Sequence, residues 1–166
     1  LTAVLAVLED TPRTVWLAAS FHRGFPEPDA MTYPADTNAT IHQRWGVPCP
    51  QKAVEALFRG YGLMDERVQF LEGFFLDTLP AAPISQLALL RCDADMYGST
   101  MQTLDALYDK VSPGGFVVID DYGAIWQSAQ AADYFRAQRG ITVPLTRIDY
   151  SGVYWQKEAV LCACSS

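Results

Sequence analysis

The sequence is poor in cysteine, in basic residues and in long apolar runs, and each shortage excludes a class of protein. Four cysteines in 166 residues are too few and too scattered for a disulfide framework. Twelve Lys and Arg against nineteen Asp and Glu give a net charge of −7, which argues against nucleic acid as a partner. The apolar runs at 3–8 and 116–119 fall far short of the ~20 residues that span a bilayer. We therefore expect a cytoplasmic protein with no nucleic-acid or membrane partner.

The length and the composition are those of one globular domain. Half of the residues are hydrophobic and 19% are charged. Because single domains often run to ~150 residues, we predict one domain over 1–166. Residues 20–50 contain five of the ten prolines, and an irregular segment of that length is usually functional. We interpret 20–50 as a loop region that forms part of a lid.

Apolar runs of strand length alternate with segments whose apolar residues recur at helical spacing. The predicted strands are 15–17, 68–71, 87–92, 116–119, 145–149 and 153–156, and the predicted helices are 2–9, 53–61, 99–111 and 126–138. This alternation predicts an α/β fold with a mainly parallel sheet. The last two strands are joined by only about three residues, which is too short for a crossover, so we predict an antiparallel C-terminal hairpin.

Two short motifs predict where elements begin and end. Ser99 with Gln102 forms a capping-box pattern, so we predict that a helix begins at Ser99. The sequence Ser-Pro-Gly-Gly at 112–115 precedes a strand and does not join a strand to a helix. We therefore interpret 112–115 as a turn and not as a phosphate-binding loop.

Four carboxylates follow two of the predicted strands. Asp93 ends one apolar run and Asp120 ends the next, with a predicted helix between them. Because a right-handed strand–helix–strand unit brings both C-terminal ends to one edge of the sheet, these acids are expected to meet where α/β folds bind ligands. Asp121 is adjacent to Asp120, and Asp95 shares a side with Asp93 if the chain stays extended.

Crowded carboxylates are unfavourable unless they retain protons or a cation neutralises them. Oxygen ligands with no His nearby in the sequence favour a hard ion such as Mg²⁺ or Ca²⁺. The alternative is that these aspartates are solvated loop acids or helix caps. Their position after two strands of one crossover favours the metal site.

Several segments, in order along the chain, resemble the macrocin O-methyltransferase family. They are 15–21, 70–75, 77–84, 93–100 (DADMYGST), 107–108, 112–115, 119–123 (IDDYG) and 152–155. Enzymes of this family methylate sugar hydroxyls on macrolide and aminocoumarin antibiotics. The resemblance implies a Rossmann-like class I methyltransferase fold, S-adenosylmethionine as methyl donor and Mg²⁺ as a required ion. It also implies a small-molecule glycosylated substrate and a role in antibiotic biosynthesis.

Position by position, the resemblance assigns roles to the four aspartates. Asp93, Asp120 and Asp121 match the family's metal-binding acids, and Asp95 matches its general base. This chemistry suits the substrate, because a divalent ion lowers the pKa of a sugar hydroxyl, which is otherwise a poor nucleophile. A base beside the ion then removes the proton, which is typically worth ~10²–10⁴-fold in rate.

The donor is expected at the ends of two strands in the first half of the chain. The candidate cofactor-binding residues are Ser20, Phe21, Glu72, Gly73 and Phe74. Glu72 and Gly73 are where we place the adenine contact. Ala19 stands where the family has an acidic residue, which in such folds hydrogen-bonds ribose hydroxyls. We therefore expect weaker donor binding, with Ser20 compensating in part.

The glycine-rich turn that follows the first strand in this family has no counterpart in this sequence. We therefore expect the chain to be the C-terminal part of a longer protein or a truncated product, lacking the central first strand and its loop. Two other functions stay open, namely a non-catalytic remnant and a Mg²⁺-dependent phosphoryl-transfer or hydrolytic enzyme. The second of these needs basic residues at the site, and Arg91 alone lies close in sequence to Asp93 and Asp95. Self-association into a homo-oligomer is also left open.

Overall fold

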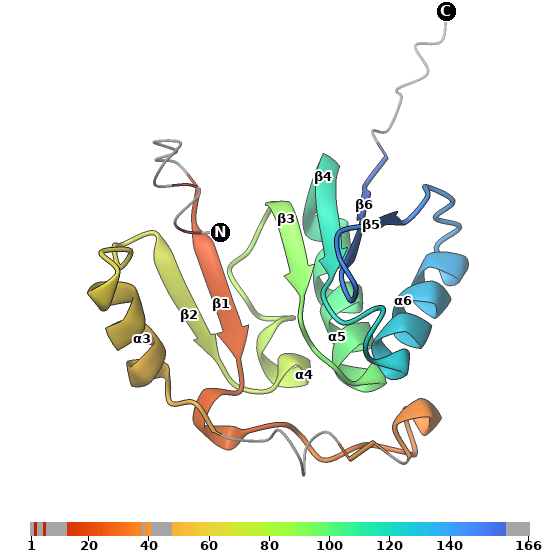
Figure 1. Cartoon of the computed structure of the whole chain (residues 1–166), viewed down its shortest axis with the longest axis horizontal. Coiled ribbons are helices and arrows are strands. Elements are labelled where there is room, and N and C mark those ends of the chain that lie inside the picture. The colour runs from red at the N-terminus through yellow and green to blue at the C-terminus, as the bar shows by residue number, and fades with distance from the viewer. Residues whose placement is uncertain (1, 3–4, 6–12, 38, 41–47, 159–166) are drawn as a thin grey trace, which may run out of the picture. The chain divides into compact units, whose positions relative to one another are not determined.

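The structure is a computed structural model that describes residues 2, 5, 13–37, 39–40 and 48–158 (Figure 1). The helix predicted at 2–9 falls almost entirely outside the described residues. The chain forms two units, each with its own internal contacts. The first comprises Leu1–Glu27 and Ile41–Thr78, and the second comprises Pro28–Thr40 and Leu79–Ser166.

The first unit is built on two parallel strands. β1 (Val15–Ala19) pairs along its whole length with β2 (Val68–Glu72). The helices are α3 (Gln51–Gly60), α4 (Phe75–Thr78) and the short η1 (Phe21–Arg23). The ring of Phe70 lies 6.0 Å from that of Phe21 and 6.5 Å from that of Phe58, between ring centroids. Both predicted strands are therefore confirmed, and they end at the same edge of their sheet.

The second unit contains a four-stranded sheet in the order β3-β4-β6-β5. The strands are β3 (Leu87–Cys92), β4 (Val111–Ile119), β5 (Thr146–Arg147) and β6 (Val153–Gln156). β3 and β4 are parallel, whereas β6 is antiparallel to both β4 and β5. The α/β fold with an antiparallel C-terminal hairpin is confirmed, although β5 is shorter than the strand predicted at 145–149.

Two helices of the second unit pack against each other (Figure 1). α5 (Tyr97–Leu107) continues into η3 (Tyr108–Lys110), and α6 (Trp126–Gln138) has the bounds predicted from the sequence. Segment 28–40 adds the short η2 (Pro34–Asp36) to this unit. The core side chains no more than 2% exposed include Met96, Leu104, Val117, Ile119, Phe135 and Trp155. This core fixes the ends of β3 and β4, from which the aspartates emerge.

The capping box predicted at Ser99 is wrong. α5 begins two residues earlier, with Met96 as its N-cap residue and no cap from that residue's own side chain. Ser99 lies inside the helix, where its carbonyl oxygen accepts a hydrogen bond of 2.8 Å from the Thr103 hydroxyl. The first amides of α5 are instead capped by the carboxylate of Asp36, far away in the sequence. A local pattern could not reveal a cap supplied by a distant segment.

The turn predicted at 112–115 is also wrong, because these residues lie within β4. They fall where the register of β4 against β3 shifts. Gly115 is needed there, since a Cβ at this position would lie only 2.9 Å from the carbonyl oxygen of Ala88. The proline and the glycines therefore make an irregularity inside the strand and do not end it.

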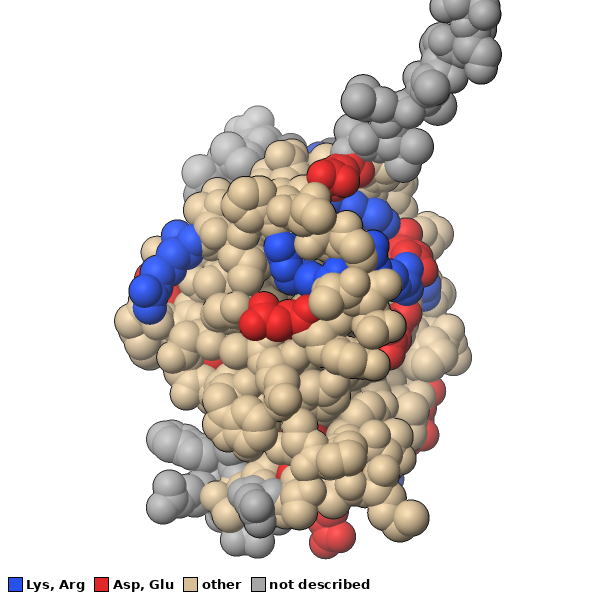
Figure 2. Space-filling model, turned by 90° about the vertical axis from the view of Figure 1, so that its right-hand side faces the viewer, with Lys and Arg blue, Asp and Glu red and all other residues tan. Residues whose placement is uncertain are grey.

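Acidic and basic side chains are interspersed on the part of the surface shown in Figure 2, where many Lys and Arg side chains lie next to Asp or Glu. The ion pair of 2.8 Å between Arg139 and Asp109 is one example in the second unit. Within the described residues, no helix combines the length and the apolar character that a membrane crossing requires.

Candidate functional site

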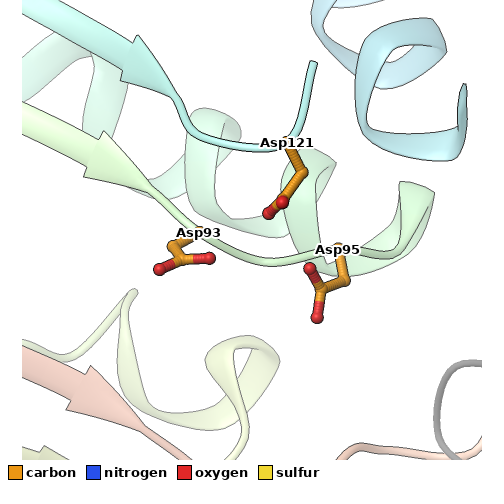
Figure 3. A group of neighbouring side chains, drawn as sticks. All are labelled: Asp93, Asp95 and Asp121. Carbon is orange, nitrogen blue, oxygen red and sulfur yellow. The ribbon is translucent and has the colours of Figure 1, made fainter. Parts of the chain in front are cut away.

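Three of the four predicted acids gather at the carboxyl edge of β3 and β4 (Figure 3). β3 and β4 end side by side, and the amide of Asp120 donates a hydrogen bond of 3.0 Å to the carbonyl oxygen of Cys92. Asp93, Asp95 and Asp121 each offer one carboxylate oxygen, and these oxygens lie within 4.8 Å of one another. We call Asp93, Asp95 and Asp121 the acid cluster.

Asp95 reaches the acid cluster through a tight turn and not through an extended chain. Its φ is +59°, in the left-handed region, which Asp tolerates better than most residues. Directly after it, the amide of Met96 donates a hydrogen bond of 2.6 Å to the carbonyl oxygen of Ala94. The expectation that an extended chain aligns Asp93 with Asp95 is therefore wrong in its geometry, although the two carboxylates do meet.

The acid cluster is electrostatically strained without a cation. Burial, together with hydrogen bonding and charge from Asp95, raises the pKa of Asp121 to about 6. Burial and neighbouring carboxylates also raise the pKa of Asp93 and that of Asp95. In addition, the Oδ2 atom of Asp121 is buried with no hydrogen-bond partner in the described part of the chain. Because buried polar atoms normally have partners, this oxygen is suited to a ligand.

Arg91 pairs both with Asp120 and with Asp93 of the acid cluster, and so links the two. Its guanidinium lies 2.8 Å from Oδ2 of Asp120 and 3.0 Å from Oδ2 of Asp93, and its Nε donates a hydrogen bond of 3.2 Å to Oδ1 of Asp120. Asp120, predicted as a metal ligand with Asp93 and Asp121, thus faces a cation that the chain already provides. Asp95, predicted as the base, stands inside the acid cluster in its place.

The predicted donor residues meet at the carboxyl ends of β1 and β2, in the first unit. Glu72 is the last residue of β2, and its Oε1 lies 2.5 Å from Nδ1 of His22. The amide of Gly73 donates a hydrogen bond of 3.0 Å to the carbonyl oxygen of Ala19, the last residue of β1. Gly73 has a φ of +139°, which suits only glycine at this step of the chain. This pairing brings the Glu72 region next to the segment that follows β1.

The other three candidates follow the same strands. Ser20 precedes η1, and its carbonyl oxygen accepts a hydrogen bond of 3.1 Å from the amide of Arg23. Phe21 is 7% exposed and has a φ of +48°. Phe74 lies under the guanidinium of Arg23, 4.5 Å from its ring centroid. The described structure therefore gathers the predicted donor residues at one strand edge, where α/β folds bind nucleotides.

Sequence reasoning missed two residues at these sites. His22 was not singled out, yet its exposed side chain pairs with the candidate ligand Glu72. Asp36 was not singled out, yet it is 1% exposed and holds the start of α5. No local signal marks either residue, because each has its partner 50 or more residues further along the chain.

Comparison with known proteins gives this geometry a context. The sequence model of the macrocin-O-methyltransferase (TylF) family matches residues 1–157. The 8-demethyl-8-(2,3-dimethoxy-alpha-L-rhamnosyl)-tetracenomycin-C 4'-O-methyltransferase of Streptomyces olivaceus is 45% identical over 95% of this chain and 60% of that protein. Demethyldecarbamoylnovobiocin O-methyltransferase of Streptomyces niveus is 47% identical over 87% of this chain and 55% of that protein. Mycinamicin III 3''-O-methyltransferase of Micromonospora griseorubida is 41% identical over 94% of this chain and 62% of that protein. The chain thus spans about 55–62% of these relatives.

Solved structures agree with the sequence comparison. The O-methyltransferase NovP is similar with a TM-score of 0.89 and 43% identity, over 95% of this chain and 65% of that one. The calicheamicin methyltransferase CalS11 shares the fold, with a TM-score of 0.69 and 22% identity over 93% of this chain and 65% of that one. These likenesses confirm the class I methyltransferase fold. The family match over nearly the whole chain shows that this chain belongs to the macrocin-O-methyltransferase (TylF) family.

Proposed function

We propose that the whole protein transfers a methyl group from S-adenosylmethionine to a sugar hydroxyl of a glycosylated secondary metabolite of the macrolide or aminocoumarin type. The transfer is assisted by Mg²⁺ and belongs to antibiotic biosynthesis. The three relatives described above, all O-methyltransferases, support the reaction class. The observation that carries the proposal for this chain is the acid cluster at the end of β3 and β4.

The acid cluster fits a hard divalent cation. Its ligands are oxygens only, and one buried oxygen of Asp121 lacks a partner among the described residues. Asp93 and Asp121 would hold the ion, in keeping with the one or two carboxylates that Mg²⁺ usually takes. Asp120 would join them when Arg91 releases it. When bound, Mg²⁺ supplies a Lewis acid that lowers the pKa of a sugar hydroxyl.

Asp95 is the residue that we assign to proton removal. Its carboxylate lies beside Asp93 and Asp121 but comes from the turn before α5, and we assign it the proton while the other two hold the ion. Neither oxygen of Asp95 is taken by Arg91, which contacts Asp93 and Asp120. Transfer of the hydroxyl proton to Asp95 leaves the oxygen as the nucleophile.

The donor site is assigned to the strand edge of the first unit. Glu72 and Gly73 are assigned to the adenine contact, while Phe21 and Phe74 offer apolar surface. Ala19 provides no second carboxylate at the end of β1. When bound, S-adenosylmethionine supplies an activated methyl group, and the residues of this chain orient it and exclude water.

The test is methyl transfer by the intact protein with S-adenosylmethionine and Mg²⁺. The acceptors are the three glycosides named for the relatives, and mass spectrometry detects a gain of one methyl group. We expect methylation of at least one acceptor and its loss on chelation. An Asp95→Asn variant should lose ~10²–10⁴-fold in turnover. Phosphate release from sugar phosphates without methyl transfer would overturn the proposal, as would a folded protein that does not bind the donor.

The phosphoryl-transfer alternative has less support from the structure. Such an enzyme needs a cation to bind phosphate, and Arg91 is engaged by the carboxylates of Asp93 and Asp120. The cytoplasmic location, the single-domain organisation with a lid at 20–50 and self-association stay predictions.

A further inference from the structure

A carboxylate from segment 28–40 holds the first turn of α5. Asp36 is 1% exposed, and both oxygens of its carboxylate are used inside the fold. Its Oδ1 accepts a hydrogen bond of 2.9 Å from the amide of Tyr97, and its Oδ2 accepts one of 2.7 Å from the amide of Gly98. Both oxygens therefore satisfy amides that a helix N-terminus leaves unpaired, where the helix dipole also favours a negative charge.

The contact is tightly packed as well as polar. The ring of Tyr33, in the same segment as Asp36, lies so close to α5 that a Cβ on Gly98 would be 2.6 Å from its Cδ2. The rings of Tyr33 and Tyr97 also lie 6.1 Å apart. Asp36 itself is held by its backbone, whose amide donates a hydrogen bond of 2.9 Å to the carbonyl oxygen of Tyr33. Segment 28–40 is thus fixed on the start of α5 at several points.

The capped amides follow the acid cluster almost directly. Tyr97 is two residues after Asp95, and only Met96, which is 2% exposed, stands between them. Asp95 adopts a left-handed backbone, which Asp tolerates better than most residues but which still costs free energy unless its surroundings enforce it. The structure provides that enforcement on one side through β3 and on the other through the capped turn of α5.

We propose that Asp36 is a positioning residue for the acid cluster. By fixing the first turn of α5, its carboxylate holds the Asp95 turn so that the Asp95 side chain stays beside Asp93 and Asp121. This inference rests on the proposed function, since Asp95 is the proton acceptor there. Asp36 itself is buried, and both of its carboxylate oxygens accept hydrogen bonds from α5.

The number of hydrogen bonds that a side chain at position 36 can accept decides which substitutions test this proposal. A carboxylate accepts both amides, whereas an Asn at this position has one acceptor oxygen and turns an NH₂ group toward the second amide. Asp36→Asn therefore keeps the size of the side chain and removes one hydrogen bond. Asp36→Ala removes both, and it also leaves two buried amides unpaired. The Asn variant keeps the test informative if the Ala variant does not fold.

Asp29→Asn is the matched control. Asp29 lies in the same segment, and its exposed carboxylate accepts a hydrogen bond of 3.1 Å from the amide of Thr32, not from α5. Amide hydrogen exchange, followed in the intact protein without donor or acceptor, directly measures how well the amides in the first turn of α5 are protected. For Asp36→Asn we expect exchange at Tyr97 and Gly98 to accelerate about tenfold or more, because a hydrogen bond to a charged group is lost. Asp29→Asn should leave the exchange rates at Tyr97 and Gly98 unchanged.

The kinetics of methyl transfer measure how the Asp36→Asn substitution affects the function of Asp95. We expect Asp36→Asn to lower kcat by about tenfold to 10²-fold, as small displacements at a reacting centre do, with KM for the donor unchanged. In an Asp95→Asn background the same change should cause no further loss of kcat, because the residue that it positions is already inactive.

The outcomes separate the two proposals. If the parent protein methylates none of the glycosides, the proposed function fails. If it is active and Asp36→Asn keeps the parent kcat, the positioning role is refuted and the function stands. A loss of kcat that is the same with and without Asp95 would equally refute it, because Asp36 would then act on the fold as a whole.

Discussion

Arg91 lies between two carboxylates that end neighbouring strands, 2.8 Å from Asp120 and 3.0 Å from Asp93. Its side chain is 54% exposed, so each ion pair is worth no more than about 1 kcal/mol. The larger role of Arg91 is to offset the repulsion among four aspartates at one sheet edge. If the proposed Mg²⁺ ion binds here, Arg91 competes with it for the same oxygens.

Arg91→Gln should destabilise the metal-free protein and strengthen Mg²⁺ binding. Without the guanidinium the carboxylates repel one another, so the thermal midpoint without Mg²⁺ should fall and the rise on adding Mg²⁺ should increase. Calorimetry and thermal unfolding with and without Mg²⁺ measure both effects. Arg59→Gln, which breaks an exposed pair with Glu55 in α3, is the control and should leave the Mg²⁺-induced rise unchanged. Weaker Mg²⁺ binding by Arg91→Gln would contradict the idea that Arg91 competes with Mg²⁺ for these carboxylates.

Asp121→Asn should cost more Mg²⁺ affinity than Asp120→Asn. Asp121 belongs to the acid cluster, whereas Asp120 is paired with Arg91. We expect Asp121→Asn to lose at least the ~10–100-fold that removal of an outer-sphere partner costs, because it removes a ligand. Isothermal titration with Mg²⁺ compares these adjacent residues under identical conditions. The reverse order of affinities would assign the ion to Asp120 and not to Asp121.

Gly98→Ala should destabilise the second unit. The added Cβ would lie 2.6 Å from the Tyr33 ring, and overpacking of this kind costs about 1–3 kcal/mol. Denaturant unfolding measures the loss. The control is Gly60→Ala, since no atom lies within 4 Å of a Cβ at this position at the end of α3. Equal effects of the two substitutions would show that Tyr33 does not pack on α5 as described.

Asp149 should make stability depend on pH in the acid range. Hydrogen bonds from the amides of Gly152 and Ser151 hold its pKa below the ordinary value of 3.8. Because the folded pKa is lowered, this contribution is fully present above the unfolded pKa of 3.8 and is lost as the pH falls through the folded value. Carboxyl NMR titration measures the pKa, and an Asp149→Asn variant should show a shallower acid-induced loss. An Asp149 pKa of 3.8 or more would contradict the turn geometry.

The elements that the sequence predicts well are those in which local pattern and tertiary packing agree. The apolar run of β3 and the helical pattern of α6 match their observed bounds because both lie in one core. The Ser99 cap and the 112–115 turn were wrong because a distant carboxylate and a close backbone contact outweigh local preference. The edge where the aspartates meet follows from topology alone.

The membership of the acid cluster could not be predicted in the same way. It depends on where Arg91 points and on the left-handed turn at Asp95, and neither leaves a mark in residue spacing. Topology brings four carboxylates to one edge, but the conformations of their side chains and of Arg91 set which contacts they make there.

The cap of α5 also bears on how the protein folds. Asp36 and Tyr97 are separated by 61 positions, so their contact ties the start of α5 to a distant part of the chain. The first turn of α5 therefore keeps this cap only while Asp36 stays in place. Catalytic competence would then be lost first on mild denaturation, while the helix content is still intact.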